Sequence, residues 1–134
     1  MPLLRGARAG AVVHLHSHHA VRLSLLPDVD PDNALPPLTP YAIMQLGHVR
    51  LLPYIRPGDP AMGRAVAELD PKTSAVILAN HGPVVAGVDL DRAVFAMEEL
   101  EATARLAVES RGESARTLTQ EQIAQLVAAF DLEA

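Results

Sequence analysis

The chain has 134 residues, of which 49% are hydrophobic and 3% aromatic, and its formal net charge is −5. This length and apolar content suit one domain with a core of aliphatic side chains, and they argue against a disordered chain. The negative charge and the lack of a basic patch argue against a nucleic-acid binder, because that affinity depends chiefly on clustered Lys and Arg.

The sequence contains no cysteine, so nitrogen and oxygen donors would have to hold any metal. The N-terminus lacks the charged segment and long apolar run of a leader peptide. No apolar run approaches the roughly 20 residues that a membrane-spanning helix needs. We therefore expect a cytoplasmic protein that does not bind membranes.

An apolar run at residues 11–17 predicts a strand that carries two histidines one residue apart. Because side chains alternate along a strand, His14 and His16 would point toward the same face, with their Cβ atoms about 6–7 Å apart. This spacing suits metal chelation. Ser17 can cap the helix that follows, which we expect to end at about Leu25.

The segment 27–60 holds eight of the eleven prolines. Since proline fixes φ and removes a hydrogen-bond donor, we expect a connecting segment with a short helix at about 40–47 and a short strand at about 51–55. Its many apolar residues predict a packed loop, which is also a candidate for a subunit contact. Apolar residues at near-helical spacing then predict a helix over 60–70.

Two short strands are expected at 75–79 and 83–86, and the turn between them contains His81. Short strands on either side of a turn predict antiparallel pairing. Two strand ends could then bring His14, His16 and His81 together as the three protein ligands of a mononuclear metal site. The spacing alone supports this interpretation no better than the alternative that the histidines are half-exposed residues at a sheet end.

The longest predicted helix spans about 90–110, with Asp89 as its N-cap and an apolar stripe that includes Leu90 and Val94. Its acidic residues are expected on the solvent face or at the edge of the stripe: Glu98, Glu99 and Glu101. A final helix begins with a capping-box pattern at Thr119.

Several polar residues near the histidine strand are further candidates. A phenol such as that of Tyr41 could exchange a proton near a metal-bound oxyanion, although a packed aromatic residue is the alternative. His18 and His19 are expected at the surface or behind the metal ligands. Asn80 and Gly82 flank His81 and are expected to shape its turn.

Residues 11–17 and 78–87, together with the acidic helix that follows them, resemble the class II aldolase/adducin family. The match runs from about residue 9 onward. Residues 12–17, 35–39 and 56–60 are similar to the branch of 3-oxo-tetronate 4-phosphate decarboxylases. The resemblance implies an α/β protein with an α/β/α layered, class II aldolase-like fold, a mainly antiparallel central sheet and assembly as a homotetramer.

The resemblance also implies that His14, His16 and His81 bind a divalent metal, usually Zn²⁺. In this family the metal polarises an oxygen next to a carbon–carbon bond that breaks by retro-aldol cleavage or decarboxylation. The implied partner is a small sugar-phosphate or oxo-acid phosphate. Tyr41 corresponds to a tyrosine that reaches a neighbouring subunit's site, which makes it a candidate for proton transfer.

Family members have a further N-terminal half that carries phosphate-binding loops and an acidic residue. No Glu or Asp precedes Asp28 in this sequence. We therefore expect residues 1–134 to form a single, partial C-terminal domain, truncated at its N-terminus. The expected function is a metal-dependent carbon–carbon lyase impaired by the truncation. The alternatives are a non-catalytic, adducin-like interaction domain, an inactive remnant, and a small metal-binding module.

Overall fold

The computed structural model describes residues 10–70 and 72–132, in which helices and strands are mixed along the chain. The elements of this part are β1 (Ala11–His14), α1 (His18–Ser24), α2 (Pro40–Leu46), β2 (Arg50–Leu52), α3 (Ala61–Ala67), β3 (Ala75–Leu78), β4 (Gly82–Gly87), α4 (Leu90–Glu109) and α5 (Gln120–Phe130). The predicted elements are all present, and their ends differ by a few residues from those expected.

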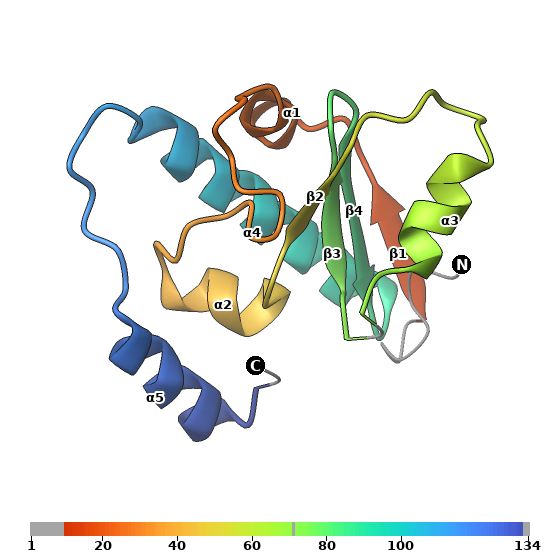
Figure 1. Cartoon of the computed structure of the whole chain (residues 1–134). Coiled ribbons are helices and arrows are strands. Elements are labelled where there is room, and N and C mark those ends of the chain that lie inside the picture. Colours follow the sequence, from red (N-terminus) through yellow and green to blue (C-terminus); the bar gives the residue numbers. More distant parts are fainter. Residues whose placement is uncertain (1–9, 71, 133–134) are drawn as a thin grey trace.

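The described strands form one sheet in the order β1-β4-β3-β2 (Figure 1). β4 pairs antiparallel with both β1 and β3, whereas β2 pairs parallel with β3. The antiparallel β3–β4 pair confirms the prediction made from the two short runs around His81. The sheet is therefore mainly antiparallel, as expected.

Helices cover both faces of the sheet, with α1, α2 and α4 on one side and α3 on the other (Figure 1). Ile77 and Val85 belong to the core beneath α1, α2 and α4. The alternate residues Val76 and Val84 belong to a second core beneath α3. This period of two along each strand confirms the α/β/α layered fold.

The two edges of the sheet differ. At the β2 edge, the N–H of Ala34 donates to the carbonyl of Val49 at 2.8 Å, and the N–H of Leu51 donates to the carbonyl of Pro31 at 2.9 Å. The proline-rich segment is therefore packed along this edge, as predicted. β1 has no neighbouring strand on its outer side within the described residues, and it leaves an open edge of the kind that invites pairing.

The predicted strand at 51–55 is shorter than expected, because β2 ends at Leu52. Pro53 follows and cannot donate a ladder hydrogen bond.

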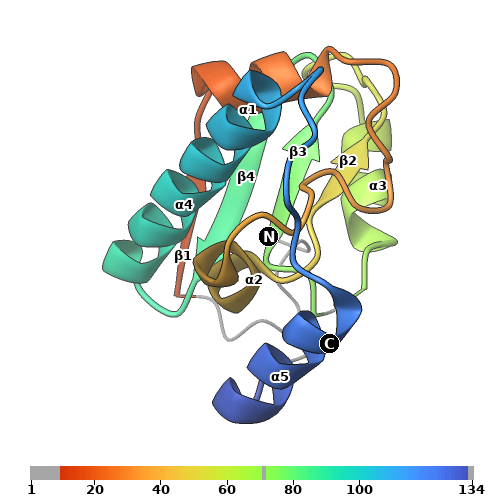
Figure 2. The ribbon, with the colours of Figure 1, turned by 90° about the vertical axis from the view of Figure 1, so that its left-hand side faces the viewer.

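The Asp89 cap of α4 is confirmed, since its carboxylate accepts from the N–H of Arg92 at 2.8 Å. The first turn of α4 is less buried than its apolar stripe predicted, and Leu90 is 61% exposed. Figure 2 shows α4 running along the sheet, with α1 beside its C-terminal half.

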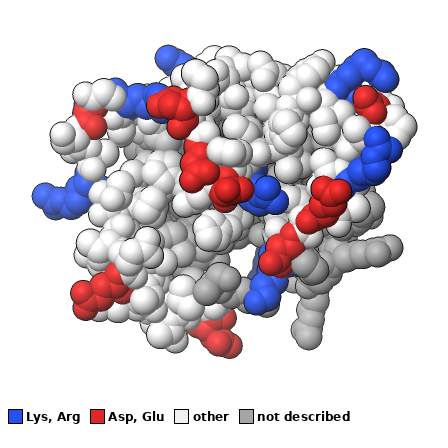
Figure 3. Space-filling view, in the orientation of Figure 1, with Lys and Arg blue, Asp and Glu red and all other residues white. Residues whose placement is uncertain are grey.

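On the face drawn in Figure 3, acidic and basic side chains are interspersed and form no large area of one sign. Across residues 10–70 and 72–132, none of the helices is both long and apolar enough to span a membrane.

Candidate metal centre

Three histidines meet where β1 and β3 end. Ring nitrogens of His14, His16 and His81 all lie within 4.8 Å of one another. The ring centroids are 4.9–5.1 Å apart for all three pairs. The structure therefore brings together the three side chains that the sequence singled out, and three converging imidazoles could hold a divalent metal.

His14 owes its place to the pairing of β1 with β4. It is the last residue of β1 and lies opposite Val84, so its side chain shares the α3 face of the sheet. Its Nδ1–H donates to the carbonyl of Pro83 at 2.9 Å. This bond sets the tautomer and leaves Nε2 with a free lone pair, 3.3 Å from Nε2 of His81.

His81 lies in the tight turn between β3 and β4. Asn80 adopts a φ of +60°, and the N–H of His81 donates to the carbonyl of Leu78 at 3.1 Å. Burial, followed by the charges of His14 and His16, holds the pKa of His81 below its usual value of 6.5. The lowered pKa favours the neutral imidazole, which is the form that binds a metal.

Gly82 allows the segment of His16 to approach this turn. Its φ is +154°, and a Cβ at this position would lie 2.1 Å from the carbonyl oxygen of Leu15 and 3.2 Å from Cα of His16. The N–H of Leu15 donates to the carbonyl of Pro83 at 3.3 Å. The prediction that Gly82 shapes the turn is confirmed, and the reason is the close contact between the two backbones.

Glu101 of α4 has a role in this region that sequence reasoning did not predict. It was expected on the solvent face or at the edge of the apolar stripe, and its side chain is 29% exposed, as at such an edge. Its carboxylate also accepts from the backbone N–H groups of His19 at 3.0 Å and Ala20 at 2.9 Å. It also accepts from Nδ1–H of His19 at 2.8 Å. Ser17 occupies the N-cap position of α1, yet its side chain makes no capping hydrogen bond. Glu101 therefore takes over the capping role expected of Ser17.

The environment of Glu101 affects its ionisation in two opposed ways. Burial raises its pKa, whereas the hydrogen bonds from His19 and Ala20 lower it. The hydrogen bonds prevail, and the pKa of Glu101 lies below its usual value of 4.5. The carboxylate is therefore ionised at neutral pH, the form that accepts hydrogen bonds most strongly.

The two tyrosines of the chain lie toward opposite ends of the sheet. Tyr41 is on α2 and is 61% exposed. The helix α2 lies at the end of the sheet away from the β3–β4 turn (Figures 1 and 2). Tyr54 follows β2, whose Leu52 carbonyl accepts from the N–H of Ala79 at 3.1 Å, so it lies at the end of the sheet where His81 is found. A single chain does not bring Tyr41 to the histidines, and its role at a neighbouring subunit's site stays a prediction.

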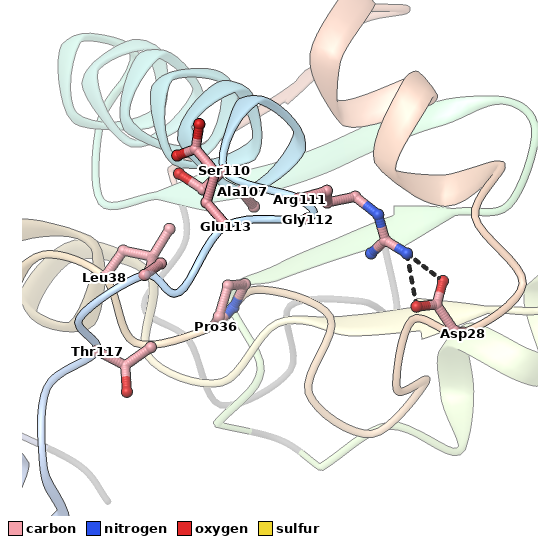
Figure 4. A pocket seen from close by; sticks show the side chains of 10 residues that line it. Asp28, Pro36, Leu38, Ala107, Ser110, Arg111, Gly112, Glu113 and Thr117 are labelled. Carbon is pink, nitrogen blue, oxygen red and sulfur yellow. Dashed lines mark hydrogen bonds and ion pairs between the residues drawn. The ribbon is translucent and has the colours of Figure 1, made fainter.

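A hollow of about 320 Å³ lies between the 28–38 loop and the end of α4. Figure 4 shows the guanidinium of Arg111 turned toward the carboxylate of Asp28, to which it donates at 2.5 and 2.6 Å. The hydrogen bond from Arg111 lowers the pKa of Asp28. Because this cation is already paired, the hollow offers weaker chemistry than the histidine cluster does.

Comparison with known proteins identifies the family of this chain. The family model described as the class II aldolase and adducin N-terminal domain matches residues 4–108. The chain belongs to the class II aldolase/adducin family.

Relatives within the family are similar in sequence and in fold. A 3-oxo-tetronate 4-phosphate decarboxylase of Cupriavidus necator is 53% identical over 98 residues, which cover 73% of this chain and 45% of that protein. The crystal structure of YgbL from Escherichia coli, a putative aldolase/epimerase/decarboxylase, has 46% identity and a TM-score of 0.87 over 91% of this chain and 59% of its own. An L-fuculose 1-phosphate aldolase has 28% identity and a TM-score of 0.74 over 92% of this chain and 57% of its own. The chain spans about half the length of the curated relatives it matches.

Proposed function

We propose that this chain forms the metal-binding part of a carbon–carbon lyase of the class II aldolase type. The observation that carries the proposal is the convergence of three histidine rings at one end of the sheet. The names of the relatives, decarboxylase and aldolase, support a lyase that acts on a sugar-phosphate or an oxo-acid phosphate.

We propose Zn²⁺ as the metal. Imidazole nitrogens are common zinc ligands, and catalytic zinc sites typically have three protein ligands and one open position. His14 is held in the tautomer that leaves Nε2 free, and His81 has a lowered pKa, so both are prepared to donate a lone pair. Among the described residues, the cluster contains no carboxylate, which leaves positions for water and substrate.

The chemistry at this site would be Lewis-acid catalysis. A bound zinc ion would stabilise the negative charge that develops on a substrate oxygen as the neighbouring carbon–carbon bond breaks. His14, His16 and His81 would hold the ion at the end of the sheet. The hydrogen bond from His14 to Pro83 would fix one ring, and the tight turn would fix the ring of His81.

We propose decarboxylation of a 3-oxo-tetronate 4-phosphate as the reaction, with retro-aldol cleavage as the runner-up. The preference rests on the higher identity to the relatives named as decarboxylases. Proton transfer by Tyr41 at a neighbouring subunit's site, in a homotetramer, is part of this proposal. Its exposure on α2 leaves its hydroxyl available to another chain.

Release of CO₂ from a 3-oxo-tetronate 4-phosphate tests the reaction, with cleavage of L-fuculose 1-phosphate measured in parallel. We expect slow CO₂ release, because the chain spans about half the length of its relatives, and we expect EDTA to abolish this release and added Zn²⁺ to restore it. A Tyr41→Phe variant should bind zinc normally but turn over more slowly. A zinc-loaded chain that transforms neither compound would contradict the lyase and favour the non-catalytic interaction domain.

A further inference from the structure

The three histidines are not anchored equally. His14 belongs to β1, and His81 lies in the β3–β4 turn, so ladder and turn hydrogen bonds hold both. His16 lies in the irregular segment between β1 and α1. Its position therefore depends on the contacts of Leu15 before it and on the way in which α1 begins after it.

The beginning of α1 is held by a side chain from another element. Oε1 of Glu101 accepts from the backbone N–H groups of His19 at 3.0 Å and Ala20 at 2.9 Å, and Oε2 also accepts from the N–H of His19 at 3.1 Å. Oε2 accepts from the ring of His19 at 2.8 Å. These bonds satisfy N–H groups that the first turn of a helix leaves unpaired. One carboxylate thus fixes both the backbone and a side chain of the first turn.

Glu101 is itself rigidly placed. It follows Leu100, which is 0% exposed and packs in the core beneath α1, α2 and α4. The side chains of Glu101 and His19 are only 29% and 23% exposed. Because Glu101 belongs to a helix that packs in the core, its carboxylate can hold the segment that it binds in a fixed position.

We propose that Glu101 is a positioning residue for His16, and this inference rests on the proposed metal function. His19 is three residues beyond His16, and each trans peptide spans only about 3.8 Å, so the intervening chain has little slack. Fixing the N–H of His19 therefore limits where the ring of His16 can lie. Metal–ligand distances must be met within about 0.2 Å, which makes the site sensitive to this limit.

Zinc affinity measured on the full chain tests the proposal. Zn²⁺ is titrated against a chromophoric chelator with wild type, E101A, E101Q and, as a control on the same helix, E98A. We expect E101A to weaken binding about tenfold or more, as for other residues that orient metal ligands. E101Q keeps an oxygen that accepts from both N–H groups, so its affinity stays within about threefold of wild type. E98A, which alters an exposed residue, leaves the affinity unchanged.

A spectroscopic measurement separates this inference from the proposed metal function. In the zinc-free protein, ¹H–¹⁵N spectra of the imidazoles should show that E101A shifts the signals of His16 more than those of His14 and His81. If wild type binds no zinc, the metal function fails, and these spectra alone decide the role of Glu101.

Two results would overturn the proposal. One is an E101A protein whose zinc affinity lies within twofold of wild type, and the other is a His16 signal that E101A does not move. Should E101A fail to fold, E101D replaces it. Its carboxylate is one methylene too short to reach both N–H groups, so E101D must also weaken zinc binding and shift His16.

Discussion

Replacing Gly82 by alanine tests whether contact between the β3–β4 hairpin and the segment of His16 shapes the metal centre. The new Cβ would lie 2.1 Å from the carbonyl oxygen of Leu15 and 3.2 Å from Cα of His16. The φ of +154° is also a conformation that L-residues rarely adopt. Alanine therefore introduces both a clash and backbone strain at one position.

The size of the effect follows from these distances. Non-bonded heavy atoms approach to about 3.5 Å, so a contact of 2.1 Å requires the two backbones to separate by about 1.4 Å. A metal site tolerates errors of only about 0.2 Å in ligand distance. The strained φ adds about 1–3 kcal/mol. We expect Gly82→Ala to lower the free energy of unfolding by at least about 1–3 kcal/mol and to weaken zinc binding at least about tenfold.

Urea unfolding of the zinc-free chain and zinc titration measure the two effects separately. Gly112→Ala is the matched control, because Gly112 has a φ of +82° and no atom lies within 4 Å of the position of its Cβ. It should lose stability through strain and keep its zinc affinity. The reasoning is refuted if Gly82→Ala binds zinc as tightly as wild type, or if Gly112→Ala weakens zinc binding to the same extent.

Three further predictions concern stability. The pKa of folded Glu101 lies below 4.5, so wild type should be more stable than E101Q above this pH, and the difference should vanish as the pH falls through the lowered pKa. Urea unfolding from about pH 7 to about pH 2 measures this difference in the free energy of unfolding, and a difference that stays constant with pH would contradict the prediction. Ile77→Ala, at a residue that is 0% exposed, should lower the free energy of unfolding by about 2–5 kcal/mol; a loss well below 1 kcal/mol would disprove the packing argument. Thr119→Ala should destabilise α5 by about 1 kcal/mol and speed the exchange of its amide hydrogens. The midpoint of global unfolding should not change, because α5 has no buried residue. An unchanged exchange rate would contradict a stabilising role of the capping box.

Features encoded by neighbouring residues were predicted well. The capping box at Thr119 is present, with both of its hydrogen bonds. The Asp89 cap and the antiparallel β3–β4 pair are present as well. Each depends on residues within a few positions of one another, so the local pattern contains the necessary information.

Features that depend on distant residues were not predicted. The hydrogen bonds between Glu101 and His19 join positions 82 residues apart, and neither position has a local pattern that indicates them. The acidic residues of α4 were therefore predicted to lie on its solvent face or at the edge of its apolar stripe. Leu90 and Val94 continue the apolar stripe in sequence but remain exposed, because periodicity identifies an apolar face without identifying what covers it.

The histidine cluster falls between these two cases. The spacing of His14 and His16 predicted one shared face, whereas the meeting with His81 depends on the pairing of β1 with β4. Spacing alone therefore left metal ligation level with the alternative of half-exposed histidines. The family resemblance added the missing long-range information, and the fold that it implied is confirmed.

Zinc stoichiometry tests the central claim most directly. Metal-free chain is titrated with Zn²⁺, and bound zinc is counted by elemental analysis for wild type, His81→Ala and the control His48→Ala, which alters an exposed residue outside the cluster. We predict one zinc ion per chain for wild type and for His48→Ala, and loss of tight binding for His81→Ala. A small fraction of an equivalent in wild type, unchanged by His81→Ala, would contradict the account.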